Sequence, residues 1–148
     1  MLQIKAEIAA EYNRFMRCLR CGACCRETEM LLANADIERL ERKGYSKKFF
    51  VRFDSEGYAK LRNRQNHCIF YDVEKQQCKV YRERPLGCRL YPVIYNETKG
   101  IVVDSICPAG GNLNEKKLKR KGKKVVKLLE KIDAEAKRRH STWSFPTV

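Results

Sequence analysis

Half of the eight cysteines in this 148-residue chain fall within one eight-residue run, CLRCGACC. The spacing Cys18-x2-Cys21-x2-Cys24-Cys25 allows a tight turn in which successive sulfurs converge, as in zinc knuckles and iron–sulfur cluster loops. Gly22 adds backbone freedom beside the sulfurs. Neighbouring side chains point apart, so one sulfur of the adjacent pair can serve a second site, bridge two metals or act chemically. The run predicts metal binding.

The other four cysteines are farther apart, in the pattern Cys68-x9-Cys78-x9-Cys88 followed by Cys107. They form no second CxxC pair, so two ordinary zinc knuckles are not expected. Pro108 follows Cys107, and a Cys-Pro pair also closes ferredoxin-type cluster runs. Eight thiols would serve one cubane cluster with spare cysteines, or two four-thiolate sites.

A disulfide framework is the alternative use of these cysteines. Four charged residues interrupt the first fifteen positions, so no signal-peptide core is expected there, and no apolar run approaches the roughly 18 residues that span a bilayer. In a reducing cytoplasm thiols stay free or bind metal. Cys24 and Cys25 cannot readily bridge each other, because adjacent Cα atoms are only about 3.8 Å apart. We therefore predict a cytoplasmic protein without a membrane segment, with an iron–sulfur cluster, favoured over zinc, as cofactor.

The predicted metal ligands are all eight cysteines: Cys18, Cys21, Cys24, Cys25, Cys68, Cys78, Cys88 and Cys107. Arg84 and Arg89 flank Cys88, and a guanidinium could donate hydrogen bonds to the sulfurs of a negatively charged centre. For Arg89 this contact and an unconnected surface position are both open, whereas Arg84 is expected to face solvent. His67 adjoins Cys68 and is expected not to be a ligand. No nucleophile–base pair stands out, so no catalytic residue is predicted.

The hydrophobic pattern predicts an α+β fold: a small, cysteine-rich, metal-stabilised domain with short strands, an N-terminal helix and a long basic C-terminal helix. The metal-binding domain is expected at 1–112, and the basic helix and tail at 113–148. Asn34 is the expected N-cap of the second helix, and prolines predict an irregular segment at 83–92. The expected elements are helices at 3–16, 35–44 and 79–83, strands at 29–32, 49–53, 58–62 and 68–71, and a hairpin at 92–104.

The predicted C-terminal helix, from about 114 to 139, carries much of the positive charge. Residues 115–140 hold twelve Lys or Arg and four acidic residues, a net +8 of the chain's +14. An apolar seam runs along the helix and is expected to dock on the core or to pair with a partner helix. Its members are Leu118, Gly122, Val125, Leu129, Ile132 and Ala136. The lysines at 115–140 could bind a nucleic acid or an acidic protein partner, but a solvated face is favoured.

Three segments carry a family resemblance: FMRCLRCGACC, the stretch CIFYDVEKQQCKVYRERPLGCRLYP, and the distal Cys107-Pro108. With AxxDIERL at 33–40, they resemble the YkgJ/CxxCxxCC family of zinc- or iron-chelating domains over about residues 15–108. The resemblance implies that the eight cysteines named above are the ligands, Cys107 less directly than the others.

Flagellin lysine N-methylases contain a related cysteine cluster, which implies iron–sulfur chemistry and protein methylation. The sequence lacks a glycine-rich strand–turn–helix for a methyl donor, so whether the chain is an enzyme stays open. The function expected from the sequence is metal binding. The alternatives are a metal-dependent protein lysine N-methylase, or its subunit, and a basic nucleic-acid-binding protein with a structural metal.

Overall fold

The computed structural model of the chain describes residues 25–104 and 113–143. It confirms the predicted α+β class, in which small helices and short antiparallel strands precede one long helix. The helices are α2 (Asn34–Arg42), α3 (Lys47–Phe50), the 3-10 helix η2 (Tyr81–Glu83), α4 (Leu86–Leu90) and α5 (Glu115–Trp143). The strands are β1 (Val51–Phe53), β2 (Ala59–Leu61), β3 (Asn63–Arg64), β4 (His67–Cys68), β5 (Tyr71–Asp72), β6 (Gln77–Cys78), β7 (Val93–Asn96) and β8 (Gly100–Val103).

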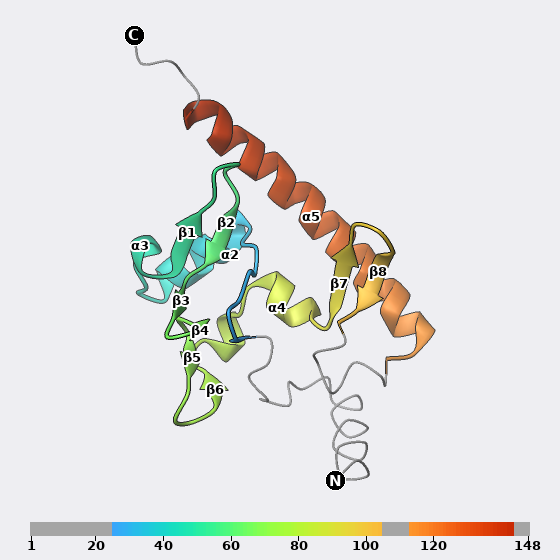
Figure 1. Ribbon diagram of the computed structural model, residues 1–148, viewed down its shortest axis with the longest axis horizontal. Helices are drawn as coiled ribbons and strands as arrows, with labels where there is room; N and C mark the ends of the chain where they lie inside the picture. Colours follow the sequence, from blue (N-terminus) through green and yellow to red (C-terminus); the bar gives the residue numbers. More distant parts are fainter. Residues whose placement is uncertain (1–24, 105–112, 144–148) are drawn as a thin grey trace.

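The strands of the described residues pair as four separate antiparallel hairpins, β1–β2, β3–β4, β5–β6 and β7–β8. The first three follow one another away from the long helix, whereas β7–β8 lies against α5 (Figure 1). Two-stranded hairpins of this length are marginal by themselves in water. Their stability here must therefore come from the side chains packed between them and the helices.

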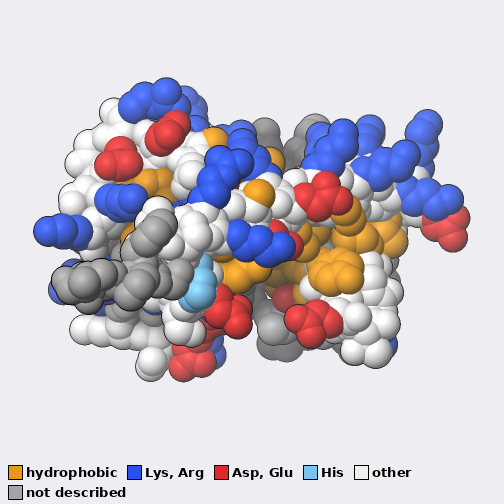
Figure 2. Space-filling view, turned by 90° about the horizontal axis from the view of Figure 1, so that it is seen from above, with side chains coloured by type: hydrophobic (Ala, Val, Ile, Leu, Met, Phe, Trp, Pro, Cys, Tyr) orange, Lys and Arg blue, Asp and Glu red, His pale blue; other side chains and the backbone are white. Residues whose placement is uncertain are grey.

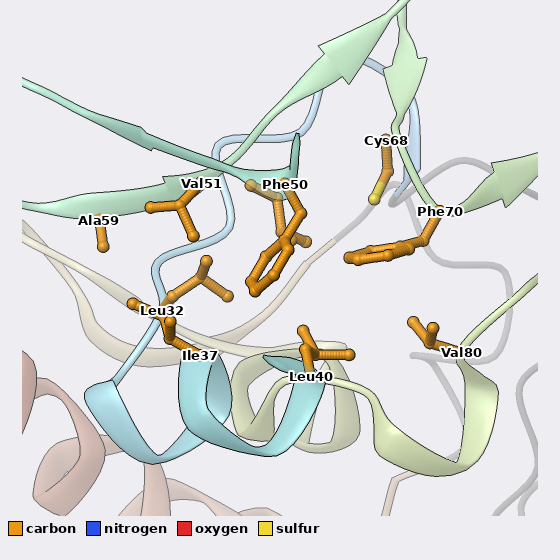
Figure 3. Packing of buried hydrophobic residues seen from close by; sticks show 10 residues of the cluster. Leu32, Ile37, Leu40, Phe50, Val51, Ala59, Cys68, Phe70 and Val80 are labelled. Atoms are coloured by element: carbon orange, nitrogen blue, oxygen red, sulfur yellow. The ribbon is translucent and has the colours of Figure 1, made fainter. Parts of the chain in front are cut away.

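The larger hydrophobic cluster, called here the cysteine-side core, lies between α2 and the first three hairpins. Ile37 and Leu40 project from α2 towards Phe50 and Phe70, and Cys68 lies at the edge of this group (Figure 3). Full burial of each large apolar side chain stabilises a fold by roughly 1.5–3 kcal/mol. The buried members are Leu32, Ile37, Leu40, Phe50, Val51, Ala59, Leu61, Cys68, Phe70 and Val80.

A second cluster, called here the helix-side core, holds α5 against the rest of the molecule. Its buried members are Ala33, Leu90, Val93, Val125, Leu128 and Ile132, and Leu118 and Leu129 pack at its margin. The predicted apolar seam therefore docks on the core, as expected, with Leu128 as a member that the seam did not include. Gly122 allows a close approach to β8, because a Cβ there would lie 2.9 Å from a methyl carbon of Ile101.

The tip of the β1–β2 hairpin also contacts α5. Arg139 donates a hydrogen bond from Nη1 to the carbonyl of Gly57 (2.6 Å), and Tyr58 donates its hydroxyl to Asp133 (2.6 Å). The hydrogen bond to the Asp133 carboxylate raises the pKa of Tyr58 to about 12. These contacts join two parts of the chain that lie some eighty residues apart in the sequence.

The start of α2 differs from the prediction, because Ala33, in extended conformation, is the N-cap and Asn34 is the first helical residue. The Asn34 side chain is not available for capping, since its Oδ1 accepts a hydrogen bond from Arg139 of α5 (2.6 Å). The Asp36 carboxylate instead reaches back to the backbone N–H of Ala33 (3.0 Å). A contact made with a distant helix thus moved the cap by one residue.

Several other boundaries also differ. The predicted strand at 29–32 makes only an isolated bridge, Leu31 to Lys60, and residues 47–50 form α3 where the strand at 49–53 was expected to begin. The strand at 68–71 is divided between β4 and β5, and the segment at 83–92 contains α4. The hairpin at 92–104 is confirmed, while the helix at 79–83 is reduced to the 3-10 turn η2.

Two sequence-based predictions fall on other parts of the chain. The helix at 3–16 lies outside the described residues, and the domain boundary after residue 112 borders the undescribed stretch 105–112, so both stay predictions. Within 25–104 and 113–143, no helix has both the length and the apolar character needed to cross a membrane.

The contact at Gly57 makes a testable prediction about stability. Gly57 has φ +90°, and a Cβ there would lie 2.5 Å from the carbonyl oxygen of Ala136. We expect Gly57→Ala to lower the free energy of unfolding by about 3 kcal/mol, because the left-handed backbone costs roughly 1–2 kcal/mol and the steric overlap adds to it. The matched control is Gly100→Ala, which shares a positive φ (+79°) but has open space around it. Equal losses in urea unfolding of the two variants would contradict the close packing of hairpin and helix.

Candidate metal centre

The structure brings together four of the eight predicted ligands, each from a different element. Cys25 directly precedes Arg26, which forms a β-bridge with His67. Cys68 lies on β4, Cys78 on β6 and Cys88 on α4. Cys68 is a buried member of the cysteine-side core, and Cys25, Cys78 and Cys88 pack half-buried against the same cluster. The other four, Cys18, Cys21, Cys24 and Cys107, lie outside the described residues.

Backbone pairing brings the segment that follows Cys25 next to Cys68. Arg26 forms an antiparallel bridge with His67, and the N–H of Glu27 donates to the carbonyl of Asn66 (2.8 Å). In an antiparallel bridge the residue before one partner lies beside the residue after the other, so Cys25, before Arg26, and Cys68, after His67, lie on neighbouring segments. The end of the CLRCGACC run is thereby fixed beside the first of the widely spaced cysteines.

Two tight turns set the positions of Cys68 and Cys78. The β3–β4 hairpin turns through Gln65 and Asn66, both with positive φ (50° and 67°), the combination that a two-residue type I′ turn requires. In the β5–β6 hairpin, Asp72 Oδ1 accepts the N–H groups of Glu74 and Lys75 (3.1 and 3.0 Å). Cys78 consequently pairs with Tyr71.

The ring of His67 stacks on Tyr71, with centroids 5.4 Å apart and planes 16° from parallel. Its Nδ1 lies 3.1 Å from the carbonyl oxygen of Gln65. These contacts orient the ring within the hairpin, and the exclusion of His67 from the ligand set stays a prediction. Tyr71 lies at the margin of the cysteine-side core.

The position of Cys88 depends on a buried carboxylate in α2. Asp36 is 2% exposed, and its Oδ1 accepts the backbone N–H of Leu86 (3.0 Å) and the guanidinium of Arg39 (2.8 Å). Arg39 Nη2 also donates to the carbonyl of Arg84 (2.8 Å). Asp36 therefore caps the first turn of α4 from a distance of fifty residues in the sequence, and Cys88 follows two residues later.

Pro85 and Gly87 explain why helix α4 forms within 83–92, where an irregular segment was expected. Pro85 lacks an N–H and lies at the N-cap, before the first helical residue, where it does not disrupt the turn. Gly87 lets α4 approach the segment after Cys25, because a Cβ there would lie 2.5 Å from the sulfur of Met30. Both Asp36 and Arg39 belong to the DIERL segment, which indicated a helix but not this interaction.

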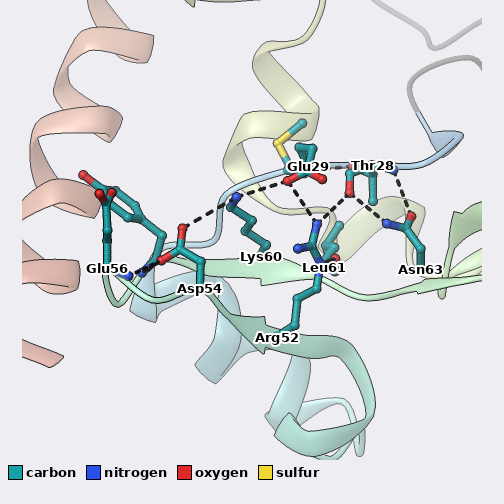
Figure 4. A network of polar contacts seen from close by, with 10 residues as sticks. Thr28, Glu29, Arg52, Asp54, Glu56, Lys60, Leu61 and Asn63 are labelled. Atoms are coloured by element: carbon teal, nitrogen blue, oxygen red, sulfur yellow. Dashed lines mark hydrogen bonds and ion pairs between the residues drawn. The ribbon is translucent and has the colours of Figure 1, made fainter. Parts of the chain in front are cut away.

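A polar network fixes the other side of the segment after Cys25 (Figure 4). Thr28 and Asn63 exchange two hydrogen bonds, backbone N–H to Asn63 Oδ1 and Asn63 Nδ2 to the Thr28 carbonyl (both 2.9 Å). Glu29 pairs with Lys60 and Arg52 at 3.1 Å each. Hydrogen bonds from Lys60 and Arg52 lower the pKa of Glu29.

The two arginines beside Cys88 have other contacts among the described residues. Arg84 is half-buried and stacks on Tyr81, its guanidinium carbon 3.9 Å from the ring centroid, and donates from Nε to the Tyr81 carbonyl (2.9 Å). The expectation that Arg84 simply faces solvent was therefore wrong. Arg89 is exposed and donates from Nη2 to the carbonyl of Arg82. A contact of Arg89 with a cysteine sulfur stays a prediction.

Within residues 25–104 and 113–143, no group of three or more His, Cys, Asp or Glu side chains is arranged to hold a metal ion. The four described cysteines share one core but do not by themselves form a ligand set. A metal centre built on them needs further ligands, and the four remaining cysteines are the candidates that the sequence supplies.

Comparison with known proteins tests the resemblance seen in the sequence. The CxxCxxCC family model, described as "Putative zinc- or iron-chelating domain", matches residues 17–108, more than half of the chain. The chain belongs to this family. The family model covers all eight cysteines, from Cys18 to Cys107.

A relative from Methanocaldococcus jannaschii, "Uncharacterized protein MJ0661", is 34% identical over 82 residues. This match covers 51% of the chain and 43% of the relative, so the chain spans less than half the length of that protein. No solved structure matches the chain significantly.

The Asp36 interaction predicts how the segment around Cys88 can be loosened. We expect Asp36→Ala to lower the free energy of unfolding by about 3 kcal/mol, because it leaves Arg39 and two backbone N–H groups without their buried acceptor. Glu38→Ala, on the exposed face of the same helix, is the matched control and should change stability by less than about 0.5 kcal/mol. Chemical unfolding measures both, and similar values for the two variants would show that Asp36 has no special role.

Proposed function

We propose that this protein binds metal through its eight cysteines and that the metal is an iron–sulfur cluster in preference to zinc. The proposed ligands are Cys18, Cys21, Cys24, Cys25, Cys68, Cys78, Cys88 and Cys107. The observation that carries the proposal is that the four described cysteines, spread over 64 residues of sequence, all pack against one core. Membership of a zinc- or iron-chelating family supports it.

The preference for iron–sulfur rests on the kind and number of ligands. The CxxCxxCC run and the Cys-Pro pair resemble cluster loops, and all the proposed ligands are thiolates. The one histidine beside a cysteine, His67, is not among the proposed ligands. A reducing compartment such as the cytoplasm, proposed as the location, keeps such thiols available for metal.

Positive charge around Cys88 fits a thiolate centre. Four thiolates around a divalent ion carry a net charge near −2, and cationic or hydrogen-bonding neighbours stabilise such centres. Arg82 lies on η2, Arg84 directly follows η2, and Arg89 lies on α4. A lysine N-methylase-like activity remains an alternative based on resemblance alone, and no feature of the described residues favours it over metal binding.

Metal analysis of the full chain, purified without oxygen, tests the proposal directly. We expect at least one equivalent of iron with acid-labile sulfide and a brown colour, whereas stoichiometric zinc in a colourless protein would support metal binding but overturn the iron–sulfur assignment. Cys78→Ser should reduce the bound metal, and Gln77→Ser, its half-buried neighbour, should not. Iron and zinc together below about half an equivalent would overturn metal binding.

Removal of the metal should affect the two cores differently. The strands β3 to β6 are two residues long and carry two of the proposed ligands, so we expect their amide protons to lose most of their protection from hydrogen exchange. The hairpin β7–β8 and helix α5 share the helix-side core, which contains no cysteine, and should stay protected. Equal protection of β3–β6 with and without metal would contradict a structural role for the metal.

A further inference from the structure

Part of the positive charge of α5 lies where the helix meets α2 and α4. A hollow of about 340 Å³ lies there, lined by basic residues from all three helices. We call it the basic groove and define it by Arg39, Arg89, Lys124, Lys127 and Lys131. Figure 2 shows Lys and Arg side chains along the upper, left-hand and right-hand edges of the face it presents and across its middle.

Four of the five cations of the basic groove have no carboxylate partner among the described residues. Asp36 is the one acidic residue among the described residues that line the hollow, and it is already bound by Arg39 and two backbone N–H groups. Arg89, Lys124, Lys127 and Lys131 form no ion pair within the described ranges, and all four are exposed. Four uncompensated charges therefore face one concave surface.

The same flank continues towards the start of α5. Partial burial lowers the pKa of Lys121, and the nearby charges of Lys117, Arg120, Lys124 and Arg84 lower it further. Like charges are thus crowded together along this flank, an arrangement that an anionic ligand would relieve.

The opposite flank of α5 has a mixed charge. Glu130 and Asp133 face a hollow of about 670 Å³ that is also lined by Asp54, Glu56, Glu97 and Lys60 of the hairpins. Lys119 and Lys123 line a neighbouring hollow on that side, where they are accompanied by Glu130. An anionic partner would be directed to the basic flank, since charge complementarity steers association.

The length of the flank favours a polymer over a single small anion. Lys117 and Lys131 are fourteen residues apart, which at 1.5 Å per residue is about 21 Å of helix. One strand of a nucleic acid carries about six phosphates over that length. No aromatic side chain lines the described wall of the groove, so contacts to phosphates, and not stacking on bases, would supply the binding.

We propose that the basic groove, extended along the Lys117–Lys131 flank of α5, binds the phosphate backbone of a nucleic-acid strand without reading its sequence. This site is distinct from the proposed metal ligands and does not depend on the identity of the metal.

Binding of a labelled 20-nucleotide single-stranded RNA of mixed sequence to the full, metal-loaded chain tests the proposal. The groove variant is Lys124→Ala/Lys127→Ala/Lys131→Ala, and the matched control is Lys119→Ala/Lys123→Ala/Lys137→Ala, which removes the same charge from exposed positions outside the hollow. Alanine preserves helix propensity in both. We expect the groove variant to weaken binding at least tenfold and to reduce the salt slope by about 2, and the control to weaken it less than about threefold.

Three results would overturn the proposal. Equal losses in both triple variants would show diffuse attraction to net charge and no defined site. If the unaltered chain bound neither RNA nor DNA at low salt, the groove would be assigned to an acidic protein partner instead. Tripolyphosphate that binds the groove more tightly than the RNA does would assign it to a small anion. Circular dichroism and metal content verify both triple variants. Lys131→Gln, a single change in the same groove on a helix without cysteines, should weaken RNA binding on its own even if the triple variant misfolds.

Discussion

The buried carboxylate of Asp36 is the interaction on which the arrangement of this protein most depends. It caps its own helix through Ala33, caps α4 through Leu86 and pairs with Arg39. Charge-assisted hydrogen bonds to a buried carboxylate are much stronger than the attraction within a surface ion pair. Without this carboxylate, α2 would still be joined to the Cys88 segment by apolar contacts, by the bonds of Arg39 to the Glu83 and Arg84 carbonyls and by the Lys43–Glu83 ion pair.

This connection matters because the elements that carry cysteines are too small to be stable alone. Strands of two residues and a five-residue helix gain little from their own hydrogen bonds. They are ordered because α2 presents Ile37 and Leu40 to a core whose margin includes all four described cysteines. A metal bound by these thiols would join the same segments a second time.

Helix α5 plays a different structural part, since it combines packing with charge. Its inner face closes the helix-side core, and Glu135, 6% exposed, accepts the backbone N–H of Asn34 (2.6 Å). Burial lowers the pKa of Arg139, while the Glu135 charge opposes that shift. Lys124, Lys127 and Lys131 line the basic groove, whereas the other flank carries both Lys119 and Lys123 and the carboxylate of Glu130, so one helix both stabilises the domain and gives it a concave basic surface.

Local patterns in the sequence were enough to predict much of this protein. The cysteine spacing identified the family, the apolar seam predicted how α5 packs, and Pro92 to Asp104 formed the expected hairpin. These features depend on residues a few positions apart, so periodicity and turn chemistry reveal them. The α+β class followed from the same patterns.

Other features were decided only by the tertiary structure. Asp36 meets Leu86 across 50 residues, and Asn34 meets Glu135 and Arg139 across 101 and 105, so the sequence did not show that α4 forms or that Glu135 is buried. The basic groove likewise exists because α2 and α4 place Arg39 and Arg89 beside one flank of α5. A buried charge is stable only beside its partner, and which partner it meets depends on how the whole chain packs.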